Sequence, residues 1–296
     1  MSALSQASSS RFQESLKRFE SSGDDLDGYF RSPEDYPLKW LLMLTAYVDE
    51  SGHEGKGWMS LAGFLGNESN WNDFVPKWRS ALGPQRKFLH MSSLRWNKDS
   101  TRRLLARLGP IPNDCKLEPV FTGVKYADYE DLVSGTPEMK ALKGWLACLT
   151  PLVMQTLRGI PEDERLELVF EEQSEYAPYA ELALRCFCIL DKPWKRTKDG
   201  RAKLAKWSFV PKGSTLMSDP ADYFAYALRE LWTDPTSKRT DWCKPILNSN
   251  NKEGYGKILY RPEIRKIIRN TQTLNTLSLL SEKLKLLGVT VSEDAK

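Results

Sequence analysis

The feature that most constrains the fold is a pair of short apolar runs, each ending in acidic residues. Residues 41–48 are almost continuously apolar and lead directly into residues 49–52, which read Asp-Glu-Ser-Gly. A second, mostly apolar run at 166–170 ends at Glu171 and Glu172. Short runs of this kind are typical of buried strands in the interior of a sheet. We therefore expect the two runs to be neighbouring central strands of one sheet.

The rest of the chain alternates between strand and helix patterns. Residues 58–65 follow the first strand closely enough to form a hairpin with it, and further strands are expected at 117–124 and 206–210. Asp219-Pro220 predicts the N-cap and first turn of a late helix. Helical spacing predicts helices over 70–82, 99–108, 137–158, 177–190 and 220–232. This order predicts an α/β fold in which helices flank a mixed sheet.

The length and composition predict one elaborated domain with extensions. The 296 residues are 41% hydrophobic, which is ample for a buried core. We predict an N-terminal appendage and linker (1–38), a core domain (39–235) and a basic helical C-terminal extension (236–296). No stretch approaches the ~20 apolar residues of a membrane span, and the Ser-rich start lacks the apolar region of a secretory signal. We therefore expect a cytoplasmic protein without a membrane partner; its oligomeric state is not indicated.

The acidic residues at the ends of apolar elements suggest a metal site. Five scattered cysteines and two histidines provide neither a zinc framework nor a disulfide scaffold. Clustered carboxylates with little histidine or thiol suit Mg²⁺ or Mn²⁺, and such ions can activate water for phosphodiester cleavage. The alternative is a chance set of acids, because strands commonly end in polar residues. On that alternative, Asp219 caps its helix and Asp222 completes a capping box.

Two segments resemble a known family. Residues 46–52 (Ala-Tyr-Val-Asp-Glu-Ser-Gly) and 221–229 (Ala-Asp-Tyr-Phe-Ala-Tyr-Ala-Leu-Arg) together resemble the bacterial and phage "domain of unknown function 3800" family. That family carries a Tyr-x-Asp-Glu-Ser-Gly signature on its first strand and a late helix that begins with Leu-Gln-x-Ala-Asp. Phe170-Glu171-Glu172 stands where the family has a strand ending in Asp-Glu, and residues 88–90 resemble its histidine-bearing segment.

The resemblance implies a ribonuclease H-like fold over roughly residues 41–235 and a nuclease that uses Mg²⁺ or Mn²⁺. Its principal ligands and catalytic residues would be Asp49, Glu171 and Asp222. Strand alternation turns Glu171 and Glu172 to opposite faces of the sheet. Glu172 would lie on the same face as the apolar residues 166, 168 and 170, which leaves Glu171 on the other face. Ser51 and His90 are expected to orient a ligand or a phosphate. The reserve ligands are Glu50, Glu172 and Asp219.

A basic stretch suggests the partner. Residues 192–212 contain eight basic residues and one acidic residue, with two tryptophans among them. Such a stretch can follow a nucleic-acid backbone and stack bases, although a solvated loop with core tryptophans has the same composition. We expect nucleic acid, DNA or RNA, to contact Trp194, Lys195, Arg196 and Lys198. The alternative function is a non-catalytic nucleic-acid or protein-binding module on an inactivated ribonuclease H-like fold.

Overall fold

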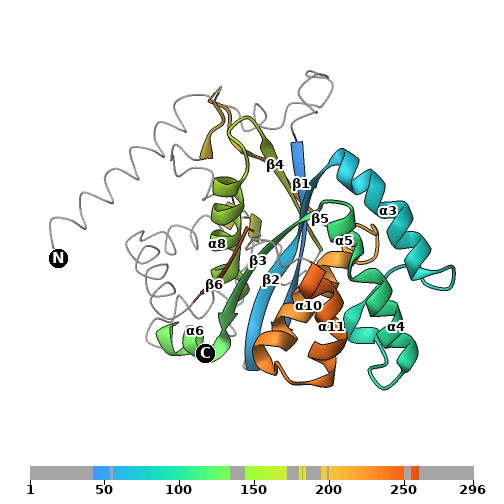
Figure 1. Cartoon of the computed structure of the whole chain (residues 1–296). Coiled ribbons are helices and arrows are strands. Elements are labelled where there is room, and N and C mark those ends of the chain that lie inside the picture. Colours follow the sequence, from blue (N-terminus) through green and yellow to red (C-terminus); the bar gives the residue numbers. More distant parts are fainter. Residues whose placement is uncertain are drawn as a thin grey trace.

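A computed structural model of the chain describes residues 43–53, 56–133, 144–171, 180–181, 183–184, 195–198, 200–249 and 255–259. The strands are β1 (Met43–His53), β2 (Lys56–Asn67), β3 (Glu118–Lys125), β4 (Arg165–Glu171), β5 (Leu204–Val210) and β6 (Tyr255–Leu259). The helices are α3 (Glu68–Leu82), η3 (Met91–Ser93), α4 (Asp99–Leu108), α5 (Ile111–Asp114), α6 (Tyr126–Val133), α8 (Gly144–Gly159), α10 (Asp219–Thr233) and α11 (Lys238–Ser249). Figure 1 shows their arrangement.

The described strands form one mixed sheet in the order β5-β4-β1-β2-β3-β6. β1, β2 and β3 are successive antiparallel neighbours, whereas β4 runs parallel to β1 and β5 runs parallel to β4. β6 adds a parallel strand beside β3. The prediction that the runs at 41–48 and 166–170 form neighbouring strands is confirmed, because β1 pairs with β4 over Met43–Val48. The expected α/β fold with a mixed, helix-flanked sheet is also confirmed.

The first strand continues further than the sequence suggested. The apolar run ends at residue 48, but β1 extends to His53 and pairs with β2 as far as Ser51 before its register shifts. The shift falls at Gly52, whose φ of +133° disfavours other residues and whose added Cβ would lie 2.7 Å from the Trp58 carbonyl oxygen. Asp49 therefore lies within a paired strand, where its backbone is aligned with Ala62 of β2.

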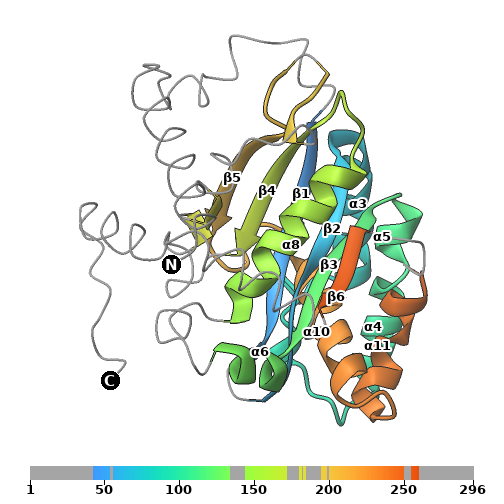
Figure 2. The same cartoon turned by 90° about the vertical axis from the view of Figure 1, so that its left-hand side faces the viewer.

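Helices cover both faces of the sheet (Figure 2). On one face α8 packs on Ala46, Val48, Leu61 and Leu168 in a purely hydrophobic cluster. On the other face α3, α4, α10 and α11 pack over a cluster rich in aromatic residues. Alternation along each strand decides which side chains meet which layer, so the odd-numbered residues of β1 near Asp49 face the aromatic layer.

The helices differ from expectation mainly at their ends. α3 begins two residues earlier than predicted, because Asn67 and Asn70 form a reciprocal capping box. The predicted N-cap Asp219 is instead the first residue of α10, and Ser218 occupies the cap position without a side-chain cap hydrogen bond. Beyond residue 235 the chain contributes α11, which packs on α10, and β6, which joins the sheet.

Several predictions fall on residues outside the described ranges. These are the N-terminal appendage and linker at 1–38, the start of the helix at 137–158, most of the helix at 177–190, and the C-terminal helical tail.

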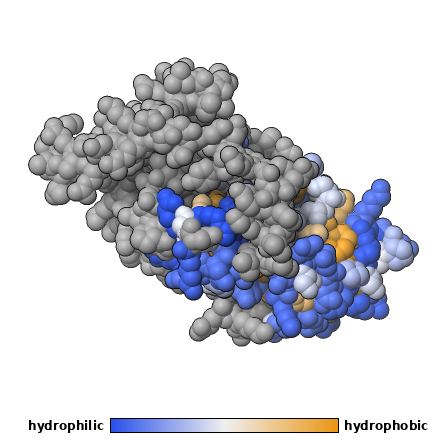
Figure 3. Space-filling model, turned by 90° about the horizontal axis from the view of Figure 1, so that it is seen from above, coloured by the Kyte–Doolittle hydropathy of each residue, from blue (hydrophilic) through white to orange (hydrophobic). Residues whose placement is uncertain are grey.

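Within the described residues, no helix is both long and apolar enough to cross a membrane. The end of the molecule seen in Figure 3 shows mostly hydrophilic residues among those described, with smaller apolar areas.

Candidate functional site

Two acids of the candidate site lie on adjacent strands of the sheet. The parallel pairing of β1 with β4 aligns Val48 with Phe170, so Asp49 and Glu171 follow at the same level on neighbouring strands. Val48 and Phe170 both belong to the hydrophobic cluster under α8. Their successors therefore face the opposite layer, which contains α10. The prediction that Glu171 turns away from the face of Leu166, Leu168 and Phe170 is confirmed, since those residues lie in the α8 cluster.

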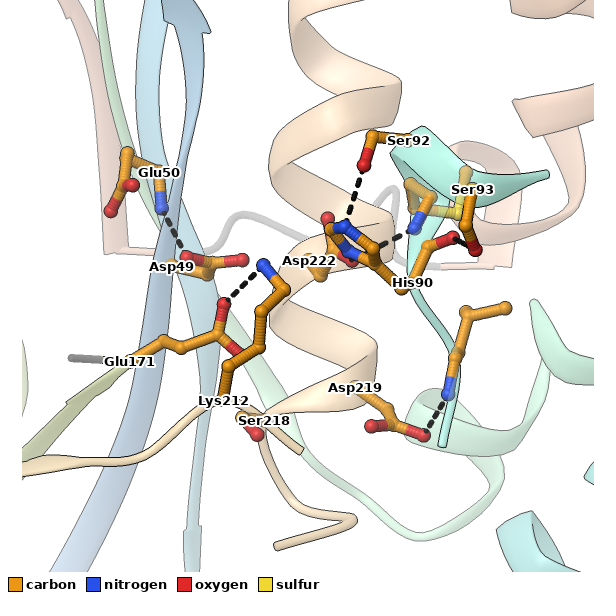
Figure 4. Close-up of polar contacts among 12 residues, drawn as sticks. Asp49, Glu50, His90, Ser92, Ser93, Glu171, Lys212, Ser218, Asp219 and Asp222 are labelled. Atoms are coloured by element: carbon orange, nitrogen blue, oxygen red, sulfur yellow. Dashed lines mark hydrogen bonds and ion pairs between the residues drawn. The ribbon is translucent and has the colours of Figure 1, made fainter. Parts of the chain in front are cut away.

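Helix α10 brings the third acid to the same place. The Ser60 hydroxyl of β2 donates to the Ala225 carbonyl oxygen at 2.8 Å, which ties the first turns of α10 to the sheet beside Asp49. Asp222 lies in the first turn of this helix, and its side chain is 15% exposed. Figure 4 shows Asp49 and Glu171 directed toward the helix that carries Asp222. The structure therefore brings together the three principal residues that the sequence selected.

A lysine ammonium lies among these three acids. Lys212, in the loop between β5 and α10, donates through Nζ to Glu171 Oε2 at 2.7 Å. Partial burial lowers the pKa of Lys212, but the Glu171 hydrogen bond and the charges of Glu171, Asp49 and Asp222 outweigh this and leave the pKa raised. The Glu171 side chain is 8% exposed and that of Lys212 is 45% exposed. Lys212 thus supplies positive charge to the carboxylates from the solvent side.

Asp49 is the most deeply buried member of the group, with 4% of its surface exposed. Its Oδ1 accepts a hydrogen bond from the Glu50 amide at 2.9 Å. Burial raises the pKa of the Asp49 carboxyl well above its usual range, and the charges of Glu50, Asp222 and Glu171 raise it further, while Lys212 opposes them. Burial is the largest cause of the raised pKa, and the crowding of like charges adds to it.

His90 and Ser92 orient Asp222 from the side opposite the sheet. Asp222 Oδ2 accepts from the Met91 amide at 2.9 Å and lies 3.1 Å from His90 Nδ1. An ionised carboxylate can only accept, so this contact requires a proton on Nδ1, while Nε2 lies 2.6 Å from the Ser92 hydroxyl. Both ring nitrogens of His90 therefore have a partner, and one of the partners is Asp222.

Asp219, which is not the N-cap of α10, accepts hydrogen bonds from two earlier segments of the chain. Its Oδ2 accepts from Trp78 Nε1 at 3.0 Å and from the Leu89 amide at 2.7 Å. Figure 4 shows this carboxylate one helical turn from Asp222 and directed toward the segment that contains Leu89. Asp219 therefore fastens α3 and the residues before His90 to the start of α10, and this contact positions His90 against Asp222.

The burial of Asp219 predicts a pH-dependent stability. Burial raises its pKa to about 7, against the lowering effect of the Leu89 and Trp78 hydrogen bonds. The folded state therefore binds this proton more tightly than the unfolded state, and the resulting stability is present at low pH and lost as pH rises from about 4 to about 7. For Asp219→Asn, which has no carboxyl proton to lose, urea unfolding should show no such fall in the free energy of unfolding. The pH dependence of this free energy should differ between the two proteins by at most about 4 kcal/mol. Parallel pH profiles for both proteins would contradict it.

The remaining predicted residues lie elsewhere or have other partners. Glu50 follows Asp49 on β1 and is half-buried, whereas Glu172 and Trp194 lie outside the described residues. Ser51 accepts through its backbone carbonyl from the Ser60 hydroxyl at 3.3 Å. Lys195 is 9% exposed. Arg196 donates to the Gly200 carbonyl oxygen, and the exposed Lys198 lies 3.9 Å from Glu162.

Other lysines of the basic stretch also have structural partners. Lys203 is buried, and its Nζ donates to the carbonyl oxygens of Leu157 and Ile160 at the C-terminal end of α8, where a cation is stabilising. Lys206 forms an ion pair with Glu167 at 2.9 Å. The stretch is therefore less available to a partner than its composition suggested.

The residues that sequence reasoning missed are Lys212 and Ser92. Lys212 was counted among the cations of the basic stretch, and only its position after β5, parallel to and beside β4, places it next to Glu171. Ser92 lies two residues after His90, a spacing that would have been a usable signal once His90 was selected.

The described residues contain no group of three or more His, Cys, Asp and Glu side chains so arranged that it could hold a metal ion. The donor chemistry, a buried Asp49 with the carboxylates of Glu171 and Asp222 near it, nonetheless suits a hard divalent cation. No family model matches this chain, and no curated protein matches it either.

Proposed function

We propose that this protein is a Mg²⁺- or Mn²⁺-dependent nuclease built on a ribonuclease H-like fold, with Asp49, Glu171 and Asp222 as ligands. The observation that carries the proposal is the meeting of these three acids on one face of the sheet. Burial and the other acids raise the pKa of Asp49, so a nearby cation favours its ionised form. Three antiparallel strands followed by two parallel ones, with acids on the central strand β1, also support this fold.

The side chains would divide the work as follows. Asp49 is held by the pairing of its backbone with β2 and by the Glu50 amide, so it offers a fixed oxygen at the bottom of the site. Asp222 is held by the Met91 amide and His90. Glu171 has a longer side chain and must exchange its contact with Lys212 for a contact with the cation. When bound, Mg²⁺ or Mn²⁺ would activate water and stabilise the leaving oxygen in phosphodiester cleavage.

The test measures Mn²⁺ and Mg²⁺ effects on thermal stability and on cleavage of labelled DNA and RNA. We expect millimolar Mn²⁺ to raise the melting temperature, since a ligand that binds only the folded state stabilises it. Asp222→Asn should lose both the shift and any cleavage. Asp73→Asn is the matched control, because it removes an exposed carboxylate that pairs with Lys77 on α3; it should keep both.

The opposite outcome has a specific structural basis. Lys212 already provides a positive charge to the three acids, and such a site can be stable without a metal. If neither ion shifts the melting temperature and no substrate is cleaved, the non-catalytic binding module becomes the better description. Cleavage that survives Asp222→Asn would also contradict the proposed ligand set.

A further inference from the structure

Three aromatic rings from separate segments pack together beside the carboxylate site. The Trp96 ring, between η3 and α4, stacks on Tyr226 of α10 with a centroid distance of 5.1 Å and an interplanar angle of 12°. It also packs against Trp242 of α11 at 6.0 Å and 28°. Tyr226 and Trp242 are buried, whereas Trp96 is half-buried. The rings therefore form a fixed base at the junction of three elements.

Each ring holds a cation over its face. The Arg229 guanidinium lies 4.6 Å from the Tyr226 centroid, Lys238 Nζ lies 4.8 Å from that of Trp242, and Arg239 lies 5.6 Å from that of Trp96. Arg239 also donates to the Tyr226 hydroxyl at 3.3 Å. Lys238 and Arg239 are exposed. A cation held against a ring loses less side-chain freedom when it meets an anion, so these charges are preorganised for binding.

The charge around the rings is predominantly positive. Residues 95–103 and 229–244 contain eight basic and four acidic residues. Two of the acids, Glu230 and Asp241, are in ion pairs with Arg229 and Lys244. The exposed cations among them are Arg95, Lys98, Arg102, Arg103, Lys238, Arg239 and Lys244. We call the three rings and these cations, with Arg229, the aromatic–basic surface.

The aromatic–basic surface adjoins the carboxylates along α10. Tyr226 and Arg229 follow Asp222 by four and seven residues, which places all three on one side of the helix within about 10 Å along its axis. Trp96 follows Ser93, the last residue of η3, by three residues, and η3 begins at Met91, which holds Asp222. Both segments that orient Asp222 therefore lead directly to the aromatic–basic surface.

We infer that the aromatic–basic surface binds the phosphate backbone of a nucleic acid and leads it to the carboxylate site. The inference deepens the proposed nuclease function and rests on it for the location of the reacting phosphate. Exposed cations that the rings hold in place, Lys238 and Arg239, provide the sequence-independent attraction that phosphates require. This assigns backbone binding to α10, α11 and the start of α4 in place of the basic stretch at 192–212.

The experiment measures binding of labelled single-stranded and double-stranded oligonucleotides by fluorescence anisotropy, in EDTA and over a series of salt concentrations. Lys238→Gln combined with Arg239→Gln should weaken binding at least tenfold and make the log–log salt dependence shallower by about two units. The matched control, Lys77→Gln with Lys125→Gln, removes two exposed cations from α3 and β3. It should change affinity less than threefold. Circular dichroism and a melting curve establish that each variant is folded.

The outcomes separate this inference from the proposed function. Binding in EDTA that depends on Lys238 and Arg239 supports the surface even if no cleavage is found with Mn²⁺ or Mg²⁺. Equal losses in both double variants would overturn it, because the attraction would then be a property of the net charge. Absence of binding by the unaltered chain would overturn it as well, whereas the Mn²⁺ shift and its loss in Asp222→Asn would still test the metal site.

Discussion

Replacing Asp49 with asparagine is expected to stabilise the protein in EDTA and to remove its response to Mn²⁺. Asparagine has the same shape and can still accept from the Glu50 amide. Burial and the charges of Glu50, Asp222 and Glu171 raise the pKa of Asp49, so its ionised form carries an energetic cost in the folded state. Each 1 kcal/mol of this cost that is removed should raise the melting temperature by about 2–4 °C.

The size of this stabilisation depends on pH. A carboxyl whose pKa is raised by folding stabilises the protein when protonated, and that stability is lost as pH rises toward the folded-state pKa. The advantage of Asp49→Asn over the unaltered chain should therefore grow with pH in melting curves recorded in EDTA. Asp73→Asn, which removes an exposed acid paired with Lys77, is the control and should give no such gain. A lower melting temperature for Asp49→Asn at neutral pH would contradict the argument.

Replacing Lys212 with methionine is expected to have the opposite effects. The variant leaves Glu171, with 8% of its side chain exposed, without its ammonium partner, so its melting temperature in EDTA should fall by several degrees. The same change removes a cation that competes with the metal for three carboxylates. Calorimetric titration should therefore show tighter Mn²⁺ binding, by about tenfold, which corresponds to about 1.4 kcal/mol.

Lys206→Met provides a matched control for this variant. Lys206 forms an ion pair with Glu167 at 2.9 Å, four residues before Glu171 on β4, and its side chain is 59% exposed. Lys206 is not among the groups that change the pKa of Asp49, so the control should leave Mn²⁺ affinity unchanged. Weaker Mn²⁺ binding by Lys212→Met would show that Lys212 positions Glu171 for the metal instead of competing with it. Binding by Lys212→Met but not by the unaltered chain would identify a site that its own lysine blocks.

The elements that could be predicted from the sequence are those whose signals are local. The apolar runs at 41–48 and 166–170 specify buried strands, and the second run even indicates which of its two terminal acids faces away from the α8 cluster, because alternation is a property of any strand. Asp219-Pro220 marks the start of α10, although the N-cap is Ser218, one residue before the predicted Asp219. The three principal acids were found in the same way, since each stands beside an apolar element that must enter the core.

Only the tertiary structure decided what those acids touch. The partners of Asp219 are Trp78 and Leu89, at separations of 141 and 130 residues, and no local pattern connects them. The aromatic–basic surface likewise joins Trp96 to α10 and α11, and β6 reaches the sheet through a pairing with β3 that its short run does not reveal.

The basic stretch shows the same difference between a local pattern and a tertiary contact. Composition counts charges along the chain, whereas availability depends on what each charge meets after folding. Lys203 donates to the end of α8, Lys206 forms an ion pair with Glu167, and Lys212 forms one with Glu171 in the carboxylate site. Local propensity and alternation are encoded in adjacent residues, but the partner of a buried charge is chosen by packing between segments that are far apart in sequence.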